Sequence, residues 1–200
     1  MLFRSALAAI EIVAAKAGAA LRLEGRDWQI DDTLKPSMAG THQLRNANLA
    51  AQMLRHAGIA NEAIRAGNAT TRWPARLQKL NPGPLTGKKQ IWIDGAHNPA
   101  AAEVVANELA THPRHVILGI LANKDADGII ASLSSHALSL TFVDVPNHDS
   151  HAPASLAATW GGKAAGSLVD ALGNLDDNIL IVGSLYLAGE ALRLNDELPD

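Results

Sequence analysis

Short apolar runs alternate with helix-like segments along the last two thirds of this 200-residue chain. Strands separated by helices pair in parallel through right-handed crossovers, so the alternation predicts an α/β fold. We expect a Rossmann-like, mostly parallel sheet with flanking helices over residues 70–200. The expected strands are residues 90–93, 116–121, 138–145, 163–165 and 178–182. The expected helices are residues 99–110, 128–135, 153–160 and 167–172, and a last one that reaches Arg193.

Residues 1–69 differ from the rest of the chain in expected secondary structure, with three helices and little strand. The helices are residues 2–18, residues 43–57 behind an N-cap at Thr41, and a short one from Asn61 to about Gly67. Two short strands, residues 20–23 and 28–30, are expected around a turn at Gly25. This segment is too poor in strands to form a complete domain. It is predicted to be the end of a preceding domain, and residues 70–200 to be a separate one.

Bulk composition excludes several classes of function. Hydrophobic residues make up 48% of the chain and charged residues 18%, as in soluble globular proteins. A net charge of −3 and 4% aromatic residues predict neither nucleic-acid nor membrane binding. Arg4, Glu11 and Lys16 interrupt the alanine-rich start, so it is neither a signal peptide nor a membrane span. The absence of cysteine fits a cytoplasmic protein, and no histidine spacing predicts a metal site.

Asp94 and His97 follow the apolar run at residues 91–93, on a turn that leads into a helix with Asn98 as its expected N-cap and Pro99 as its first residue. Open α/β sheets bind ligands at such strand ends, so we expect both side chains to be exposed there. A carboxylate suits a ribose hydroxyl or a cation, and an imidazole suits a phosphate or carboxylate. Alternatively, Asp94 only caps the turn and His97 is solvated.

Two further segments carry weaker signals. His42 and Asn46 lie one helical turn apart, and the Asn46 amide suits the edge of an adenine ring, although both residues could simply face water. Arg76 follows the extended Trp73-Pro74 pair, where a guanidinium could bind a phosphate or merely lie on a linker.

Strand ends also carry Lys124, Asp125 and Ser184. Lys124 and Asp125 follow the expected strand at residues 116–121 and are site candidates by position, although a solvated loop also explains them. Ser184 follows Gly183 after the last strand. Its hydroxyl would face the same edge of the sheet, but helix capping alone accounts for it.

Taken in order, these motifs resemble the carboxyl-terminal half of the folylpolyglutamate synthase/dihydrofolate synthase family, within the wider Mur ligases. The Asp-Gly-Ala-His-Asn-Pro element is the most specific part of the resemblance. The motifs are Gly40-x-His42-Gln43-x-x-Asn46-Ala47, Trp73-Pro74-x-Arg76, Asp94-Gly95-Ala96-His97-Asn98-Pro99, Gly119-Ile120 with Asn123-Lys124-Asp125, and Gly183-Ser184-Leu185-Tyr186-Leu187.

The resemblance implies an ATP-dependent ligase that activates a carboxylate as an acyl phosphate and joins it to L-glutamate. ATP, Mg²⁺, glutamate and dihydropteroate or folate are the implied ligands of such an enzyme in folate biosynthesis. Asn46 would contact adenine, Arg76 the ATP phosphates, and Asp94 the region of the ribose and phosphates. His97 would contact phosphates or glutamate, and Ser184 glutamate. The resemblance also points, less directly, to His42, Gln43, Lys124 and Asp125.

The sequence departs from the family pattern at its most important element. Members carry a phosphate loop ending in Gly-Lys-Ser or Gly-Lys-Thr, whereas Gly87-Lys88-Lys89 and Gly162-Lys163-Ala164 lack the hydroxyl. The main catalytic groups and the Mg²⁺ ligands are therefore expected upstream of Met1. Ala39 and Ala75 replace a frequent proline and glycine.

We accordingly expect the chain to be inactive alone and to associate with itself through the face that the missing part would cover. The alternatives are another Mur-type amino-acid ligase and a non-catalytic nucleotide-binding or interaction module.

Overall fold

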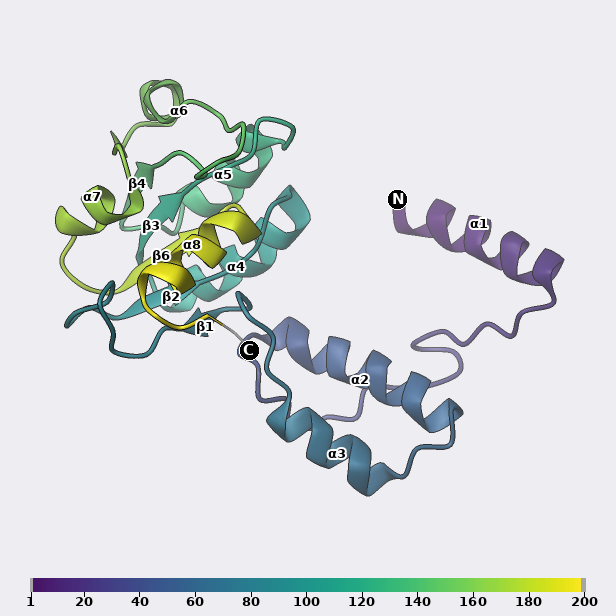
Figure 1. Ribbon diagram of the computed structural model, residues 1–200. Coiled ribbons are helices and arrows are strands. Elements are labelled where there is room, and N and C mark those ends of the chain that lie inside the picture. Colours follow the sequence, from purple (N-terminus) through teal and green to yellow (C-terminus); the bar gives the residue numbers. More distant parts are fainter. Residues whose placement is uncertain (1, 199–200) are drawn as a thin grey trace.

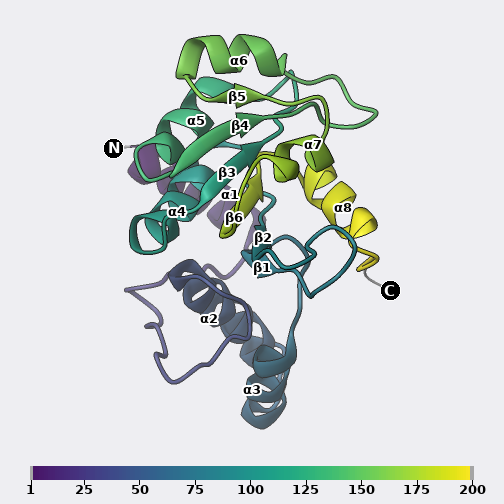
Figure 2. The same ribbon diagram turned by 90° about the vertical axis from the view of Figure 1, so that its left-hand side faces the viewer.

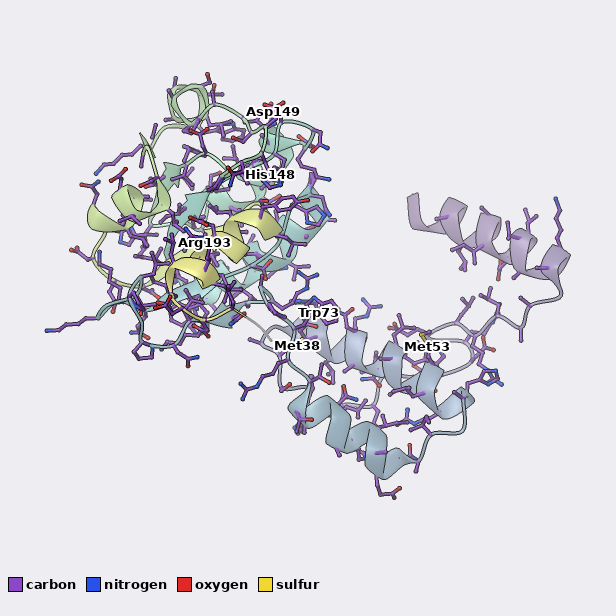
Figure 3. All side chains as sticks on the ribbon, viewed as in Figure 1. Met38, Met53, Trp73, His148, Asp149 and Arg193 are labelled. Atoms are coloured by element: carbon purple, nitrogen blue, oxygen red, sulfur yellow. The ribbon has the colours of Figure 1, made fainter. Side chains whose placement is uncertain are left out.

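The structure, a computed structural model, describes residues 2–198, with the side chains of residues 2–5 and 41 left out. Figure 1 shows three parts along the chain: helix α1 (Leu2–Ala17), a pair of helices, α2 (Thr41–His56) and α3 (Asn61–Thr70), and a sheet covered by helices. The division into domains at residues 69 and 70 stays a prediction, although α3 ends there. Trp73 lies in the link between the helical pair and the sheet (Figure 3).

The sheet has six strands in the order β1-β2-β6-β3-β4-β5. Five of them are parallel, and β1 pairs antiparallel with β2 at one edge. The predicted mostly parallel α/β architecture is therefore confirmed. The strands are β1 (Gln78–Lys79), β2 (Ile91–Ile93), β3 (His115–Leu118), β4 (Ser139–Phe142), β5 (Lys163–Ala164) and β6 (Ile179–Val182).

Helices cover both faces of the sheet (Figure 2). Alternate residues of β6 divide between the two cores: Leu180 and Val182 pack toward α4 and α5, whereas Ile179 and Ile181 pack toward α7 and α8. All four residues of β6 are buried, as expected of a central parallel strand. The helices are α4 (Pro99–Thr111), α5 (Ala126–Ser134), α6 (Pro153–Trp160), α7 (Leu168–Gly173) and α8 (Leu185–Leu194).

Several local predictions were wrong. The strands expected at residues 20–23 and 28–30 are absent from the described chain, where a single bridge joins Glu24 and Trp28. Gly40 and not Thr41 occupies the N-cap of α2, and Asn61 is the first residue of α3 behind Ala60. The antiparallel strand β1 was not predicted, because two polar residues carry no strand pattern.

The amino-terminal part has only a small core, formed by Leu34, Ala51 and Ile64 between α2, α3 and the loop before them. The described side chains of α1 are largely exposed, including Ile10, Ile12 and Val13. The expected self-association of the chain stays a prediction. Among the described residues, no helix is both long and apolar enough to span a bilayer.

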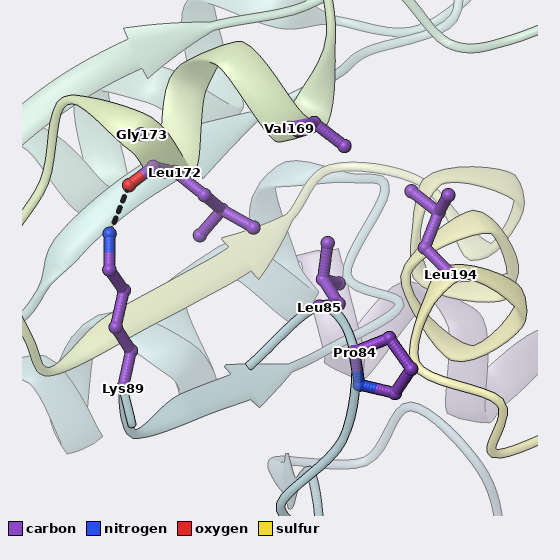
Figure 4. A pocket seen from close by; sticks show the side chains of 7 residues that line it. All are labelled: Pro84, Leu85, Lys89, Val169, Leu172, Gly173 and Leu194. Carbon is purple, nitrogen blue, oxygen red and sulfur yellow. Dashed lines mark hydrogen bonds between the residues drawn. The ribbon is translucent and has the colours of Figure 1, made fainter. Parts of the chain in front are cut away.

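A shallow cavity lies between α7, the end of α8 and the loop before β2 (Figure 4). Lys89 donates from Nζ to the carbonyls of Leu172 and Leu175 beside it, and so closes the end of α7. Leu194, the last residue of α8, lines this cavity. Ser184, the N-cap of α8, lies at the other end of that helix, where β6 ends. The cavity is therefore separate from the strand ends that carry the predicted site.

Gly183 allows the chain to turn between β6 and α8. Its φ is +110°, and a Cβ there would lie 2.8 Å from the Gly119 carbonyl oxygen. We predict that Gly183→Ala lowers the free energy of unfolding by about 2 kcal/mol or more, because backbone strain and the clash add together. Gly189→Ala is the control, since a Cβ within α8 meets nothing within 4 Å. It should stabilise the protein by up to about 1 kcal/mol. Urea unfolding measures both, and equal effects would contradict this account of the turn.

Candidate functional site

Most of the predicted site residues directly follow the carboxyl ends of parallel strands, so they lie along the same end of the sheet. Asp94 follows β2, Ser184 follows β6, and Lys124 and Asp125 lie in the loop after β3. The order of the strands places β6 between β2 and β3. These loops therefore occupy the edge at which open α/β sheets bind ligands.

Gly95 is the point at which three segments meet. A Cβ on Gly95 would lie 2.2 Å from Leu185 Cδ2 and 3.2 Å from Arg76 Nη1. The Gly95 amide donates to the carbonyl of Ala75 (2.9 Å), and His97 Nδ1 lies 2.8 Å from the carbonyl oxygen of Gly95. The structure thus brings Arg76, Asp94 and His97 together around Gly95, a position with no space for a side chain.

Asp94 is buried, with 5% of its surface exposed, so the expectation that it is exposed was wrong. Its Oδ2 accepts from the Leu77 amide and its Oδ1 from the Ala96 amide, both at 2.8 Å. The carboxylate therefore joins the turn after β2 to the segment that carries Arg76. Burial raises the pKa of Asp94, while the two amides, Arg76 and His42 act in the opposite direction.

His97 is half-buried at the start of α4. Because its Nδ1 faces a carbonyl oxygen, that nitrogen must carry a proton, which leaves Nε2 directed elsewhere. Asn98 caps α4 by accepting from the Ala101 amide at 2.9 Å, and Pro99 is the first helical residue, both as predicted. The start of α4 therefore combines an imidazole with the positive end of a helix dipole.

The first turn of α2 reaches the same place from the amino-terminal part of the chain. Gly40 has φ +102°, and a Cβ there would lie 2.5 Å from His42 Cε1 and 3.5 Å from Leu77 Cδ1. The His42 ring is thus packed over Gly40, beside Leu77. Burial lowers the pKa of His42, the Asp94 charge raises it and the Arg76 charge lowers it. Two motifs separated along the sequence therefore share one electrostatic environment.

The other two predicted residues of the α2 motif differ in exposure. Gln43 is buried and lies between His42 and Asn46, whereas Asn46 is exposed. Asn46 Nδ2 donates to Gln43 Oε1 at 3.2 Å.

The remaining predicted residues serve as helix caps or as loop contacts. Ser184, 1% exposed, accepts from the Tyr186 amide at 3.1 Å, and Asp125 accepts from the Gly128 amide at 2.9 Å. The carbonyl of Lys124 accepts from His151 Nε2 at 3.0 Å. The bond of Ser184 is the helix cap named as its alternative role, whereas the cap that Asp125 forms at the start of α5 was not predicted. Their predicted roles toward ligands stay predictions.

A contact that the sequence did not predict joins the loop after β4 to α8. The rings of His148 and Tyr186 are stacked, with their centroids 3.7 Å apart and an interplanar angle of 27°. His148 and the neighbouring Asp149 lie in the loop beside the sheet (Figure 3). No spacing rule connects two residues so distant in sequence, so only the fold identifies this pair.

The described residues include no group of three or more His, Cys, Asp or Glu side chains that could hold a metal ion. Arg76 is the cation nearest to Gly95, and its Nη1 donates to the Ala75 carbonyl oxygen at 3.2 Å. A guanidinium beside a helix start is well suited to an anion. Of the groups that the resemblance implies, the residues present therefore fit a phosphate better than a magnesium ion.

Comparison with known proteins gives the family. The folylpolyglutamate synthase of Lacticaseibacillus casei is 33% identical over 183 residues, which cover 82% of this chain and 41% of that protein. The dihydrofolate synthase/folylpolyglutamate synthase of Mycobacterium tuberculosis is 35% identical over 128 residues, or 58% of this chain and 25% of that protein. This chain belongs to the folylpolyglutamate synthase/dihydrofolate synthase family. No family model matches it.

The fold agrees with this membership. A crystal structure of Mycobacterium tuberculosis folylpolyglutamate synthase complexed with ADP and AMPPCP superimposes with a TM-score of 0.80 at 26% identity. The match covers 94% of this chain and 52% of that structure. The chain thus spans about half the length, or less, of the relatives that it matches.

The shared environment of Asp94 makes a prediction about titration. We expect its pKa to lie above the ordinary value of 3.8 and to rise further in Arg76→Ala, because the mutation removes a nearby positive charge. Arg72→Ala is the control, since Arg72 is exposed in the preceding loop. Carboxyl-detected NMR titration measures the change.

The sign of the linked stability follows from the same shift. The native state binds this proton more tightly than the unfolded state, so the unfolding free energy falls as pH rises from 3.8 through the folded pKa.

The titration of the variants tests the interaction between Asp94 and Arg76. An Asp94 pKa that is unchanged in Arg76→Ala, or equally changed in Arg72→Ala, would show that Asp94 and Arg76 do not interact.

Proposed function

We propose that this chain forms the carboxyl-terminal wall of a nucleotide and glutamate site in an ATP-dependent ligase. The reaction adds L-glutamate to dihydropteroate or a folate. The observation that carries the proposal is the convergence of Arg76, Asp94 and His97 on Gly95, with the first turn of α2 packed against them. The relatives, which are folylpolyglutamate synthases, supply the reaction class, and the Mycobacterium tuberculosis complex with ADP and AMPPCP supports the nucleotide.

Arg76 is proposed to bind the phosphates of ATP. Its guanidinium can neutralise charge that develops as the γ-phosphoryl group moves to the carboxylate of the acceptor. Asp94 is proposed to act mainly as a positioning residue for Arg76 near the ribose and phosphates. Its bond to the Leu77 amide fixes the backbone next to the arginine, and its bond to the Ala96 amide fixes the turn after β2. Their burial makes this backbone geometry rigid.

His97 and Ser184 are proposed to contact glutamate or phosphate. His97 Nε2 is the ring nitrogen that does not face the Gly95 carbonyl, so it is the nitrogen that a ligand would contact. Ser184 begins α8, where backbone amides provide further donors for an anion. The glutamate amine would then attack the acyl phosphate, forming the amide bond and releasing phosphate.

Asn46 is proposed to contact the adenine ring, because its exposed amide offers both a donor and an acceptor. His42 and Gln43 support that contact from the same helix. Lys124 and Asp125 belong to the loop at the same edge, where Asp125 starts α5. Mg²⁺ would supply further neutralisation of phosphate charge, and its ligands are expected on the half of the relatives that this chain does not span.

A non-catalytic nucleotide-binding module is the second candidate. It is favoured by the finding that Asp94, Ser184 and Asp125 already bind backbone amides within the fold. A Mur-type ligase with a different amino acid would share the nucleotide contacts and differ at the glutamate contacts.

The nucleotide site predicts a specific effect of Arg76. We expect ADP to shift the amide NMR signals of Arg76, Gly95 and His97 in the intact 200-residue chain. Arg76→Ala should weaken ADP binding by about tenfold or more, the usual cost of a charged hydrogen bond, and Arg72→Ala by less than about twofold. Equal weakening by both variants would point to general charge attraction and would remove the evidence for this site.

Ligation itself is expected to need more than this chain. With ATP, magnesium, dihydropteroate and radiolabelled L-glutamate, the purified chain should incorporate no label above background, because positioning and metal-assisted charge neutralisation supply most of the rate in phosphoryl transfer. The Lacticaseibacillus casei relative is the positive control for the assay. Robust label incorporation by the chain alone would contradict the proposed division of the active site.

A further inference from the structure

Three adjacent side chains on the first turns of α2 form a hydrogen-bonded row. Gln43, 3% exposed, lies in the middle, with Nε2 at 2.9 Å from His42 Nε2 and Oε1 at 3.2 Å from Asn46 Nδ2. One end of the row is the half-buried His42 ring, and the other is the exposed Asn46 amide. A buried carboxamide therefore connects a titratable group with a surface group.

The direction of these bonds fixes the state of both neighbours. An amide nitrogen can only donate, so His42 Nε2 must accept and the neutral ring must carry its proton on Nδ1. Gln43 Oε1 can only accept, so Asn46 turns its nitrogen inward. The other end of the Asn46 amide, the oxygen Oδ1, is then directed away from Gln43.

The surroundings of His42 favour the neutral ring. Burial is the largest influence on its pKa and lowers it. The charged groups that face the ring are Asp94, after β2, and Arg76, before β1, and they act in opposite directions. Gly40 allows the ring to pack closely, since any Cβ there would meet the ring's Nδ1 and Cε1 atoms.

We propose that Gln43 is a positioning residue that sets which end of the Asn46 amide faces outward according to the protonation of His42. When His42 is neutral, the row exposes Asn46 Oδ1, an acceptor for an exocyclic amino group. A proton on Nε2 would turn the ring into a donor there, and the Gln43 amide would have to reverse. Asn46 would then reverse in turn and expose its nitrogen, which matches an oxo group instead.

This inference rests on the proposed function in one respect, the contact of Asn46 with a nucleobase. Under that assignment the neutral row selects a 6-aminopurine over a 6-oxopurine. The row itself is a property of the free chain and is tested without nucleotide. The two parts can therefore fail separately.

The decisive measurement is the tautomer of His42, read from long-range ¹⁵N–¹H couplings in the intact chain. We expect the proton on Nδ1 above the pKa of the ring. Gln43→Glu replaces the donor with an acceptor, so His42 should carry a proton on Nε2 and bind it roughly tenfold more tightly or more. Gln43→Met keeps the size of the side chain, removes both hydrogen bonds, and should abolish the preference for Nδ1.

Gln52→Glu is the matched control, because it adds the same charge further along α2. It should leave the tautomer unchanged. An Nε2–H tautomer in the unmodified chain, or an Nδ1–H preference that survives in both Gln43 variants, would overturn the proposal. If Gln43 had only a structural role, its substitution would change the stability of the protein but not the tautomer of His42.

Selectivity is measured by titrating the chain with ADP and with inosine diphosphate, which differ at the 6-position of the purine. We expect ADP to bind about fivefold to tenfold more tightly, and Gln43→Met, which removes the acceptor that orients the Asn46 amide, to reduce that ratio toward one. An unchanged ratio in Gln43→Met would overturn the selectivity part of the proposal. If neither nucleotide binds, the proposed function fails, and the selectivity part fails with it, while the tautomer still decides whether the row exists.

Discussion

The arrangement of the site depends on one buried carboxylate. Asp94 accepts hydrogen bonds from the amides of Leu77 and Ala96, which belong to segments on opposite sides of the β1–β2 hairpin. Without that side chain, two buried N–H groups would lose their partners, at a cost of about 1–3 kcal/mol each. The same two bonds hold Arg76 beside Gly95. The carboxylate therefore positions the arginine through the backbone, without a direct ion pair.

This constraint also explains why α2 packs where it does. The segment held by Asp94 includes Leu77, and the His42 ring packs beside Leu77 over Gly40. Burial of the ring and of the carboxylate shifts their pKa values in opposite directions, so that each group is less readily charged than in water. The charges of Asp94 and Arg76 act on the pKa of His42 in opposite directions, so burial remains the largest influence on the ring.

Much of the sheet was predictable, and the reasons are local. Strand β6 is a continuous apolar run and β3 is mostly apolar, and the helices that follow them have caps at Asp125 and Ser184, so both strands can be recognised from short stretches of sequence. Strand β1 was not predictable, because its two polar residues carry no strand pattern and its pairing with β2 is a tertiary contact, which lies next to the bond between Leu77 and Asp94. The buried state of Asp94 was missed for the same reason. A strand end is normally solvated, and here a segment distant in sequence covers it.

The polar residues at this edge of the sheet fall into two physical classes. Asp94, Ser184 and Asp125 accept from backbone amides and so fix the conformation of the loops. The side chains of Arg76 and His97 bond to nearby carbonyl oxygens, and that of Asn46 bonds to Gln43. Each of these three side chains has further polar atoms that a ligand could contact. Preorganisation requires both classes, since a ligand-binding side chain is useful only when its backbone is already fixed. Sequence motifs do not distinguish these classes, because a capping aspartate and a ligand-binding aspartate occupy the same position at a strand end.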